Sequence, residues 1–489
     1  MNPNFNLILL LSYFLVLIVV SLITSRKVNA SSFYLGDRKS PWPLVAIGMI
    51  GASLSGVTYL SVPGWVSSIQ FKYIQMVLGY LVGYAIIAFL LLPLYYRQNL
   101  TSIYTYLDQR FGKNAYKMGS TYFIISRTIG ASFRLFLVAN VLHLAIFSLY
   151  DLPFPFTVAC TLFLIFTYSF IGGIKTIVYT DVLQTVFMIL AVVVSIYFLS
   201  NELNIAIYEI PQTILQSPHS QVFDWQWKSS QFFPKSFLGG VFIAVVMTGL
   251  DQDMMQKNLS IKTLKKAQKN MYMQIPLFLT ANLIFLVLGF LLLVFKEKIG
   301  FDTKSLQTSD DLFSLFALQN KNWLISSSFF IGLIAAAYSS ADSAITALTT
   351  SFCVDFLGFE RTKKTHKPTR RWVHFGFSLC IFFVIIFFKK LNNDAVIKQL
   401  FTAVGFTYGP LLGTFAFGIF TNRKIVDHYI WHVSVISILL TALYYVYIPQ
   451  LIDGYQAGFE ILILNGLYTF IGLILLNIYE RRRKNKEIF

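Results

Sequence analysis

The stretch GLIAAAYSSADSAIT, residues 332–346, decides how the rest of this sequence is interpreted. It lies inside a hydrophobic segment that runs from Trp323 to Phe352 and is long enough to cross a bilayer as a helix. Hydrocarbon offers no hydrogen-bond partner, so an aspartate and several serines in mid-membrane must face protein, water or an ion. Asp342 is therefore a candidate functional residue.

Helical spacing places the polar residues of this segment on one face. Ala336, Ser339, Ser340 and Ser343 follow the i, i+3, i+4, i+7 pattern, and Asp342 borders them. Hydroxyl and carboxylate oxygens are hard ligands, which suit a small alkali cation. The alternative is close packing of small residues, with each serine bonded back to the preceding turn. Packing alone does not account for the aspartate.

The composition indicates an all-α polytopic membrane protein. Of 489 residues 56% are hydrophobic and only 12% are charged, about half the charged share of soluble domains. No soluble domain fits between the apolar segments. Hydropathy predicts about thirteen transmembrane helices: Asn6–Thr24, Leu44–Val66, Tyr73–Tyr96, Gly119–Leu149, Phe156–Phe170, Ile177–Leu199, Phe237–Met255, Met271–Val294, Trp323–Phe352, Trp372–Phe388, Ile397–Phe420, Tyr429–Tyr447 and Phe459–Tyr479.

The distribution of basic residues predicts the orientation. The formal net charge is +17, which by itself would also fit a nucleic-acid partner. The basic residues instead cluster in alternate loops, which is the positive-inside bias of a multi-pass protein of the inner (plasma) membrane. We therefore expect no nucleic-acid partner, a bilayer environment, an outside N-terminus and a cytoplasmic C-terminus. The clusters are Arg26–Lys39, Arg97–Lys117, Lys175, Lys257–Lys269, Arg361–Arg371, Arg423–Lys424 and Arg481–Lys486.

The second predicted span is crowded with glycines and serines and carries Pro63, so we expect its helix to break. A break frees backbone carbonyls for a cation and exposes a helix N-terminus to a polar solute. Gly48, Ala52 and Gly56 recur every four residues, so a small-residue packing seam is the other interpretation.

Five further charged positions lie within or beside spans. Arg134 is deep enough in its helix to meet an anionic solute or a structural partner, whereas Arg127 is expected to snorkel or to pair with a carboxylate. Asp181 follows the Gly172-Gly173 turn, either as a helix-start carboxylate or as the second charge of a cation site with Asp342. Asp251 and Asp253 approach the inner interface, where a solvated gate or a salt bridge is expected.

The spans fall into two groups of five, the second to sixth and the seventh to eleventh. An odd number of helices per group makes the halves opposite in orientation, as in inverted-repeat transporters. The domain prediction is an N-terminal extra helix and cytoplasmic loop (1–41), a first repeat (42–200), an extracellular loop (201–235), a second repeat (236–421), and two peripheral helices with a basic tail (422–489).

Several motifs together resemble the sodium/solute symporter family, which includes sodium/glucose, sodium/proline and sodium/sialic acid cotransporters. The resemblance covers nearly the whole chain. It is carried by Gly172-Gly173 with Thr180-Asp181 and Gln184, by the Ala335–Ser343 run, by Ser55-Gly56 and Pro63-Gly64, and by Asp251-Gln252 with Gln256-Lys257.

The resemblance implies a leucine-transporter-type core of two inverted five-helix repeats and sodium-coupled alternating access. The implied ligands of the principal sodium ion are the carbonyls of Gly51, Leu54 and Ala336 and the hydroxyls of Ser339 and Ser340. Some relatives have a second sodium near the positions of Asp181, Ser339, Asp342 and Ser343. Asp342 stands where those relatives show serine, which either strengthens that site or lets a proton replace the second ion. The implied solute contacts are Ser53, Ser55, Thr58, Gln75 and Arg134.

The predicted function is a sodium-coupled symporter, acting as a monomer, that imports a small polar organic solute such as a sugar, a sialic acid or other sugar acid, or an inositol-like polyol. A sodium-coupled amino-acid or carboxylate symporter is the alternative. An intramembrane enzyme and a solute sensor are more distant ones, because no Ser, His and acid spacing supports a catalytic triad and no signalling domain is attached. Cys160, Cys353 and Cys380 show no spacing typical of a metal or disulfide framework.

Overall fold

The computed structural model describes residues 3–25, 30–300, 309–320, 322–359, 367–391 and 396–487, and within these ranges it is helical without strands. Ten helices are long and apolar enough to cross a membrane, or twelve if each of two bent pairs is one span. The predicted segment Phe156–Phe170 corresponds to a shorter apolar helix, Phe154–Ser169. The count of thirteen therefore stays a prediction. Residues 26–29 and 361–366 of the predicted basic clusters lie outside the described ranges.

The first half of the chain contains α1 to α10. Their bounds are α1 Pro3–Thr24, α2 Ala30–Leu35, α3 Trp42–Ser53, α4 Gly56–Ile69, α5 Tyr73–Ile86, α6 Leu92–Arg97, α7 Thr105–Arg110, α8 Lys113–Ala145, α9 Phe154–Glu202 and α10 Ile210–Gln216. The second half contains α11 Phe233–Ala244, α12 Gln252–Leu259, α13 Leu264–Phe295, α14 Asp311–Gln319, α15 Trp323–Ser351, α16 Lys367–Leu391, α17 Val396–Phe420, α18 Ile430–Leu451 and α19 Glu460–Glu487.

Both groups of five begin with a broken span. The chain bends by 58° between α3 and α4, which confirms the predicted break, and by 62° between Phe233–Gly249 and α12, which the sequence analysis did not predict. The bends occupy corresponding positions in the two groups. This correspondence supports the internal repeat.

The two predicted spans after Pro153 form one continuous element, α9, with a kink at Gly173. Gly173 has φ 56° and ψ −150°, a backbone conformation that residues with a Cβ rarely adopt. An added Cβ would also lie 2.5 Å from the Phe33 ring. The kink turns the second half of α9, with Asp181, toward α3 and α15.

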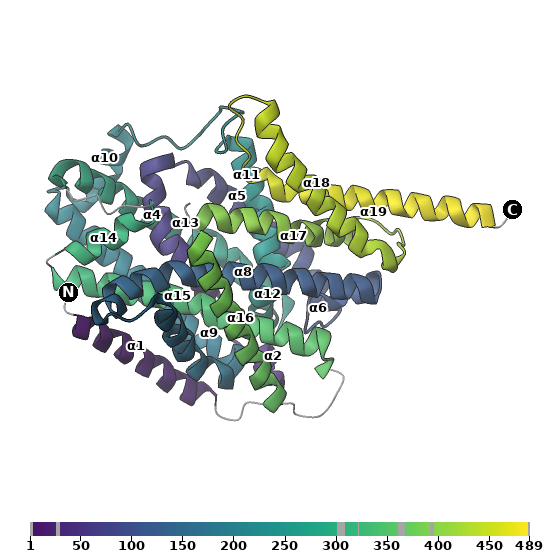
Figure 1. Ribbon diagram of the computed structural model, residues 1–489, viewed down its shortest axis with the longest axis horizontal. Helices are drawn as coiled ribbons and strands as arrows, with labels where there is room; N and C mark the ends of the chain where they lie inside the picture. The colour runs from purple at the N-terminus through teal and green to yellow at the C-terminus, as the bar shows by residue number, and fades with distance from the viewer. Residues whose placement is uncertain are drawn as a thin grey trace.

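Helix α15 lies at the centre of the bundle. In its most apolar window 83% of residues are buried, against 22% for the span that contains α18. It packs against α9, α8 and α16, whereas α18 and α19 lie at one side and the end of α19 projects from the body (Figure 1). The polar face of α15 therefore meets protein, as hydrocarbon requires.

Candidate functional site

The break between α3 and α4 lies against the polar face of α15. Leu54 and Ser55 leave the helical conformation, and among the described residues no backbone N–H donates to the carbonyls of Gly51 or Leu54. A Cβ on Gly51 would lie 3.4 Å from the Ser339 hydroxyl. The structure thus brings Gly51 and Ser339 together and leaves two carbonyl oxygens free for a cation.

The remaining residues expected at the principal cation site belong to α15 and are buried. The Ser340 hydroxyl donates to the Ala337 carbonyl at 3.1 Å and lies 3.5 Å from the Ala336 carbonyl. The Ala336 carbonyl and the Ser340 hydroxyl therefore lie on the helical turn that also contains Ser339. This serine bond is also the one that the packing interpretation predicts.

Thr185 is a hydroxyl at this place that the sequence analysis missed. It donates to the Asp181 carbonyl at 2.6 Å and to the Ile47 carbonyl at 3.1 Å, and it lies 2.1 Å from where a Cβ on Gly51 would stand. Its i+4 spacing from Asp181 was the available signal, because that spacing places both on one helix face.

Asp181 makes a buried ion pair with Lys257. Lys257 Nζ lies 2.7 Å from Asp181 Oδ2, and the Ser339 hydroxyl donates to Asp181 Oδ1 at 2.9 Å. The prediction that Lys257 belongs to a basic cytoplasmic loop is wrong, because this lysine is only 1% exposed. The buried carboxylate attracts the ammonium out of the interface, since an unpaired charge of either sign is costly there.

The four residues suggested for a second cation site make hydrogen bonds to different partners. Asp181 and Ser339 face each other, but the Ser343 hydroxyl donates to Asp253 on α12. Asp342 accepts from the Tyr168 hydroxyl at 2.8 Å and from the Ser343 N–H at 2.6 Å.

A second charged network ties α8 to α12 and α17. Arg127 pairs with Asp253, and its Nη1 lies 3.7 Å from Asp251 Oδ2, which also accepts from Tyr408 at 2.5 Å. Both aspartates are buried, at 0% and 1% exposure. The expected salt bridge is present, whereas the expectation of a solvated position is wrong, because α8 and α17 cover it.

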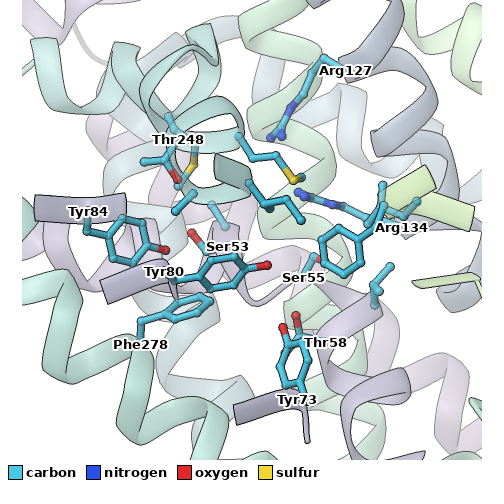
Figure 2. A pocket seen from close by; sticks show the side chains of 18 residues that line it. Ser53, Ser55, Thr58, Tyr73, Tyr80, Tyr84, Arg127, Arg134, Thr248 and Phe278 are labelled. Atoms are coloured by element: carbon cyan, nitrogen blue, oxygen red, sulfur yellow. The ribbon is translucent and has the colours of Figure 1, made fainter. Parts of the chain in front are cut away.

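A cavity of about 70 Å³ with polar and apolar walls lies beside the broken span, and Ser53, Ser55, Thr58 and Arg134 all line it. Figure 2 shows them around one space with residues that the sequence analysis missed. Some of the missed residues are aromatic or bear hydroxyls, namely Tyr73, Tyr80, Tyr84, Thr248 and Phe278, and others are apolar, among them Ile243, Met247, Met254 and Leu400. The three tyrosines recur at i, i+7 and i+11 on α5, so helical periodicity was the signal for them.

Arg134 also lines this cavity and forms no ion pair with an acidic side chain among the described residues. It is 7% exposed, none of the ion pairs within the described residues includes it, and its Nε has no hydrogen-bond partner. Arg127, which also lines the cavity, is neutralised by its aspartates. A buried arginine that forms no ion pair with a carboxylate among the described residues can bind the anionic group of a solute.

Gln75 does not line the cavity, so its expected solute contact is corrected. Its amide donates to the carbonyls of Lys72 at 3.1 Å and Gln231 at 3.0 Å and accepts from the Asp224 N–H at 3.2 Å. Its polar atoms are thereby bonded to the start of α5 and to the loop between α10 and α11.

The chain as a whole is similar to known proteins. A model of the sodium:solute symporter family matches residues 33–426. The chain belongs to the sodium:solute symporter family. This membership confirms the expectation of a sodium-coupled membrane transporter rather than an enzyme.

Curated relatives carry several solutes. The chain is 25% identical over 408 residues to the sodium-dependent multivitamin transporter of Oryctolagus cuniculus, covering 81% of the chain and 62% of that transporter's length. It is 22% identical over 432 residues to a sodium/sialic acid symporter of Aliivibrio fischeri, covering 86% of the chain and 83% of the relative. The sodium/iodide cotransporter of Homo sapiens is 24% identical over 408 residues, which cover 80% of the chain and 61% of the relative.

Two solved symporter structures show the same fold. A substrate-bound, outward-open sodium-coupled sialic acid symporter matches with TM-score 0.79 and 20% identity, covering 96% of this chain and 97% of the other. Mhp1, a nucleobase-cation-symport-1 family transporter, matches with TM-score 0.58 and 13% identity over 91% and 94% of the two chains. The leucine-transporter-type core expected from the sequence is therefore confirmed.

Proposed function

We propose that this symporter imports a small acidic organic solute, of the chemistry of a sialic acid or another sugar acid, together with sodium. The observation that carries the proposal is Arg134, a buried guanidinium without an acidic partner among the described residues, in a cavity lined by serine, threonine and tyrosine hydroxyls. A guanidinium binds a carboxylate through two parallel hydrogen bonds, and hydroxyls bind the rest of a sugar.

The names of the relatives support an anionic solute. Sialic acid, iodide and monocarboxylates are negatively charged, and each appears in the name of a sodium-coupled relative. A simple carboxylate is therefore the second candidate. The hydroxyl and aromatic groups on the remaining walls favour a larger polyhydroxylated acid.

In the proposed sodium site, the free carbonyls of Gly51 and Leu54 and the Ala336 carbonyl join the hydroxyls of Ser339 and Ser340. A sodium ion there would tie the broken span to α15. Because α4 begins at this break and carries Thr58 into the cavity, the same contact would fix the solute site. Sodium and solute are then coupled because both stabilise one conformation.

The cavity is smaller than the 300–1,000 Å³ typical of a ligand site, so solute entry requires a wider conformation of the bundle. Alternating access supplies one. Each sodium ion that moves inward across 100 mV contributes about 2.3 kcal/mol in addition to its concentration gradient.

The proposed setting is the plasma membrane, with the N-terminus outside and the C-terminus in the cytoplasm. A single chain is the proposed transport unit, because both segments of the sodium site and the described walls of the cavity come from one chain.

Uptake into proteoliposomes tests the proposal. Full-length protein is reconstituted, and labelled sialic acid, glucuronate, lactate, glucose and inositol are offered with an inward sodium gradient or an inward potassium gradient. We expect accumulation of an acidic solute in sodium alone. Sodium-driven accumulation of only the neutral sugars would contradict an anionic solute, and a flat trace in every condition would contradict symport of these classes.

A further inference from the structure

Lys257 is a lysine in an unusual position for its type. It lies on the last turn of α12, just past the bend of the seventh span, and is buried among membrane-spanning helices. Its ammonium meets one carboxylate, that of Asp181, at 2.7 Å. Lysine is a strongly hydrated point charge, so its burial requires a compensating contact of this kind.

The Asp181 carboxylate connects this ammonium to the proposed sodium site. One carboxylate oxygen accepts from Lys257, and the other accepts from the Ser339 hydroxyl at 2.9 Å. Ser339 faces Gly51 at the break of α3 and α4. The Lys257 ammonium is therefore linked to the proposed sodium site through one carboxylate, that of Asp181, and one hydroxyl, that of Ser339.

The other oxygens suggested for a second cation site with Asp181 are engaged by separate partners in the described structure. The Ser343 hydroxyl donates to Asp253, which also pairs with Arg127, and Asp342 accepts from Tyr168 and from a backbone N–H. A further sodium ion at Asp181 would have to displace the ammonium or share a carboxylate with it at close range. Repulsion between like charges in a medium of low dielectric constant opposes the second arrangement.

We propose that Lys257 is a built-in cation that occupies the position beside Asp181 where a second sodium ion would otherwise bind. The chain then needs one sodium ion per transport cycle, and the ammonium holds α12 to α9 throughout. This inference rests on the proposed function, since it takes the Gly51, Leu54, Ala336, Ser339 and Ser340 site as the one that sodium fills.

Counting bound sodium at equilibrium tests the inference. Radioactive sodium is titrated onto purified full-length protein, without solute, in wild type and three variants. The wild type is expected to bind one sodium per chain. Lys257→Gln leaves Asp181 with a vacant carboxylate oxygen and is expected to bind two. Lys257→Arg keeps a resident cation, and Lys257→Gln with Asp181→Asn removes both charges, so each is expected to bind one.

Lys257→Gln leaves a buried carboxylate unpaired, which is destabilising. If this variant is too unstable for sodium counting, its melting temperature provides a second test. In that case high sodium should raise the melting temperature of Lys257→Gln more than that of wild type or of the doubly substituted protein. Equal sodium-induced shifts in all three would overturn the inference.

The outcomes separate this inference from the proposed function. Two sodium ions on the wild type, or one on a folded Lys257→Gln protein, would overturn the built-in cation and leave sodium symport intact. No sodium bound to the wild type would instead contradict the proposed sodium site itself.

Discussion

Substitution of Arg134 by glutamine tests the solute assignment. Glutamine keeps a polar side chain but removes the charge and the two-pronged donor geometry. Hydrogen bonds to charged groups contribute about 1.5–3 kcal/mol, and each 1.4 kcal/mol is tenfold in affinity. The half-saturating concentration of the acidic solute should therefore rise about 10- to 100-fold.

Two comparisons make this prediction specific. The amide of the same solute lacks the negative charge, so Arg134→Gln should change its affinity little, and uptake competition in proteoliposomes measures both ligands. Arg134→Lys restores the charge without the fork and should fall between wild type and Arg134→Gln. Equal losses for the acid and its amide would refute the proposed contact.

The absence of an acidic partner also predicts a stability effect. Burying a charge without a partner costs free energy, and none of the described ion pairs compensates Arg134. Without solute, Arg134→Gln should melt at the same temperature as wild type or higher. A marked loss of stability would instead indicate a structural role for the guanidinium.

Three other perturbations test the surrounding structure. Gly51→Ala places a Cβ 2.1 Å from the Thr185 hydroxyl. This clash should lower the free energy of unfolding by about 1–3 kcal/mol and weaken sodium binding. A wild-type melting temperature and sodium affinity would contradict the close approach. Arg127→Ala leaves the buried Asp253 carboxylate without its ion-pair partner and should lower the free energy of unfolding by about 3–5 kcal/mol. Adding Asp253→Ala should recover part of that stability in thermal unfolding. A double variant no more stable than Arg127→Ala would contradict the pairing. In the loop between α10 and α11, burial acts to raise the pKa of Asp224, but hydrogen bonds from Gln226, Lys72 and Ser229 outweigh it and lower that pKa below the usual range. Loop anchoring should therefore be complete at neutral pH and weaken as acid protonates Asp224, seen as faster hydrogen exchange in residues 217–232, and an unchanged protection in acid would contradict it.

The sequence predicted the elements of the fold better than their partners. Apolar runs located the spans, and the glycines and serines around Ser55 predicted the first break, because both signals are local. The bend between Gly249 and Gln252 was not predicted, although Gly249 and Asp251 interrupt the apolar run there.

The long-range contacts of the site were beyond the sequence. Lys257 and Asp181 are 76 residues apart, and a lysine next to a basic loop is expected in water. Gln75 was expected to contact the solute, but only the fold shows that its amide is bonded to Lys72, Asp224 and Gln231 instead. Asp342 and Ser339 were correctly predicted to face protein, since hydrocarbon leaves no alternative.

The central claim is that oxygens from the break of α3 and α4 and from α15 hold one sodium ion between them. Its most direct measurement is the sodium concentration that half-saturates solute binding, in wild type and in Ser340→Ala. Loss of one ligand oxygen should raise that concentration about tenfold or more, with solute binding at saturating sodium preserved. A Ser340→Ala protein with the wild-type sodium requirement would contradict the assignment.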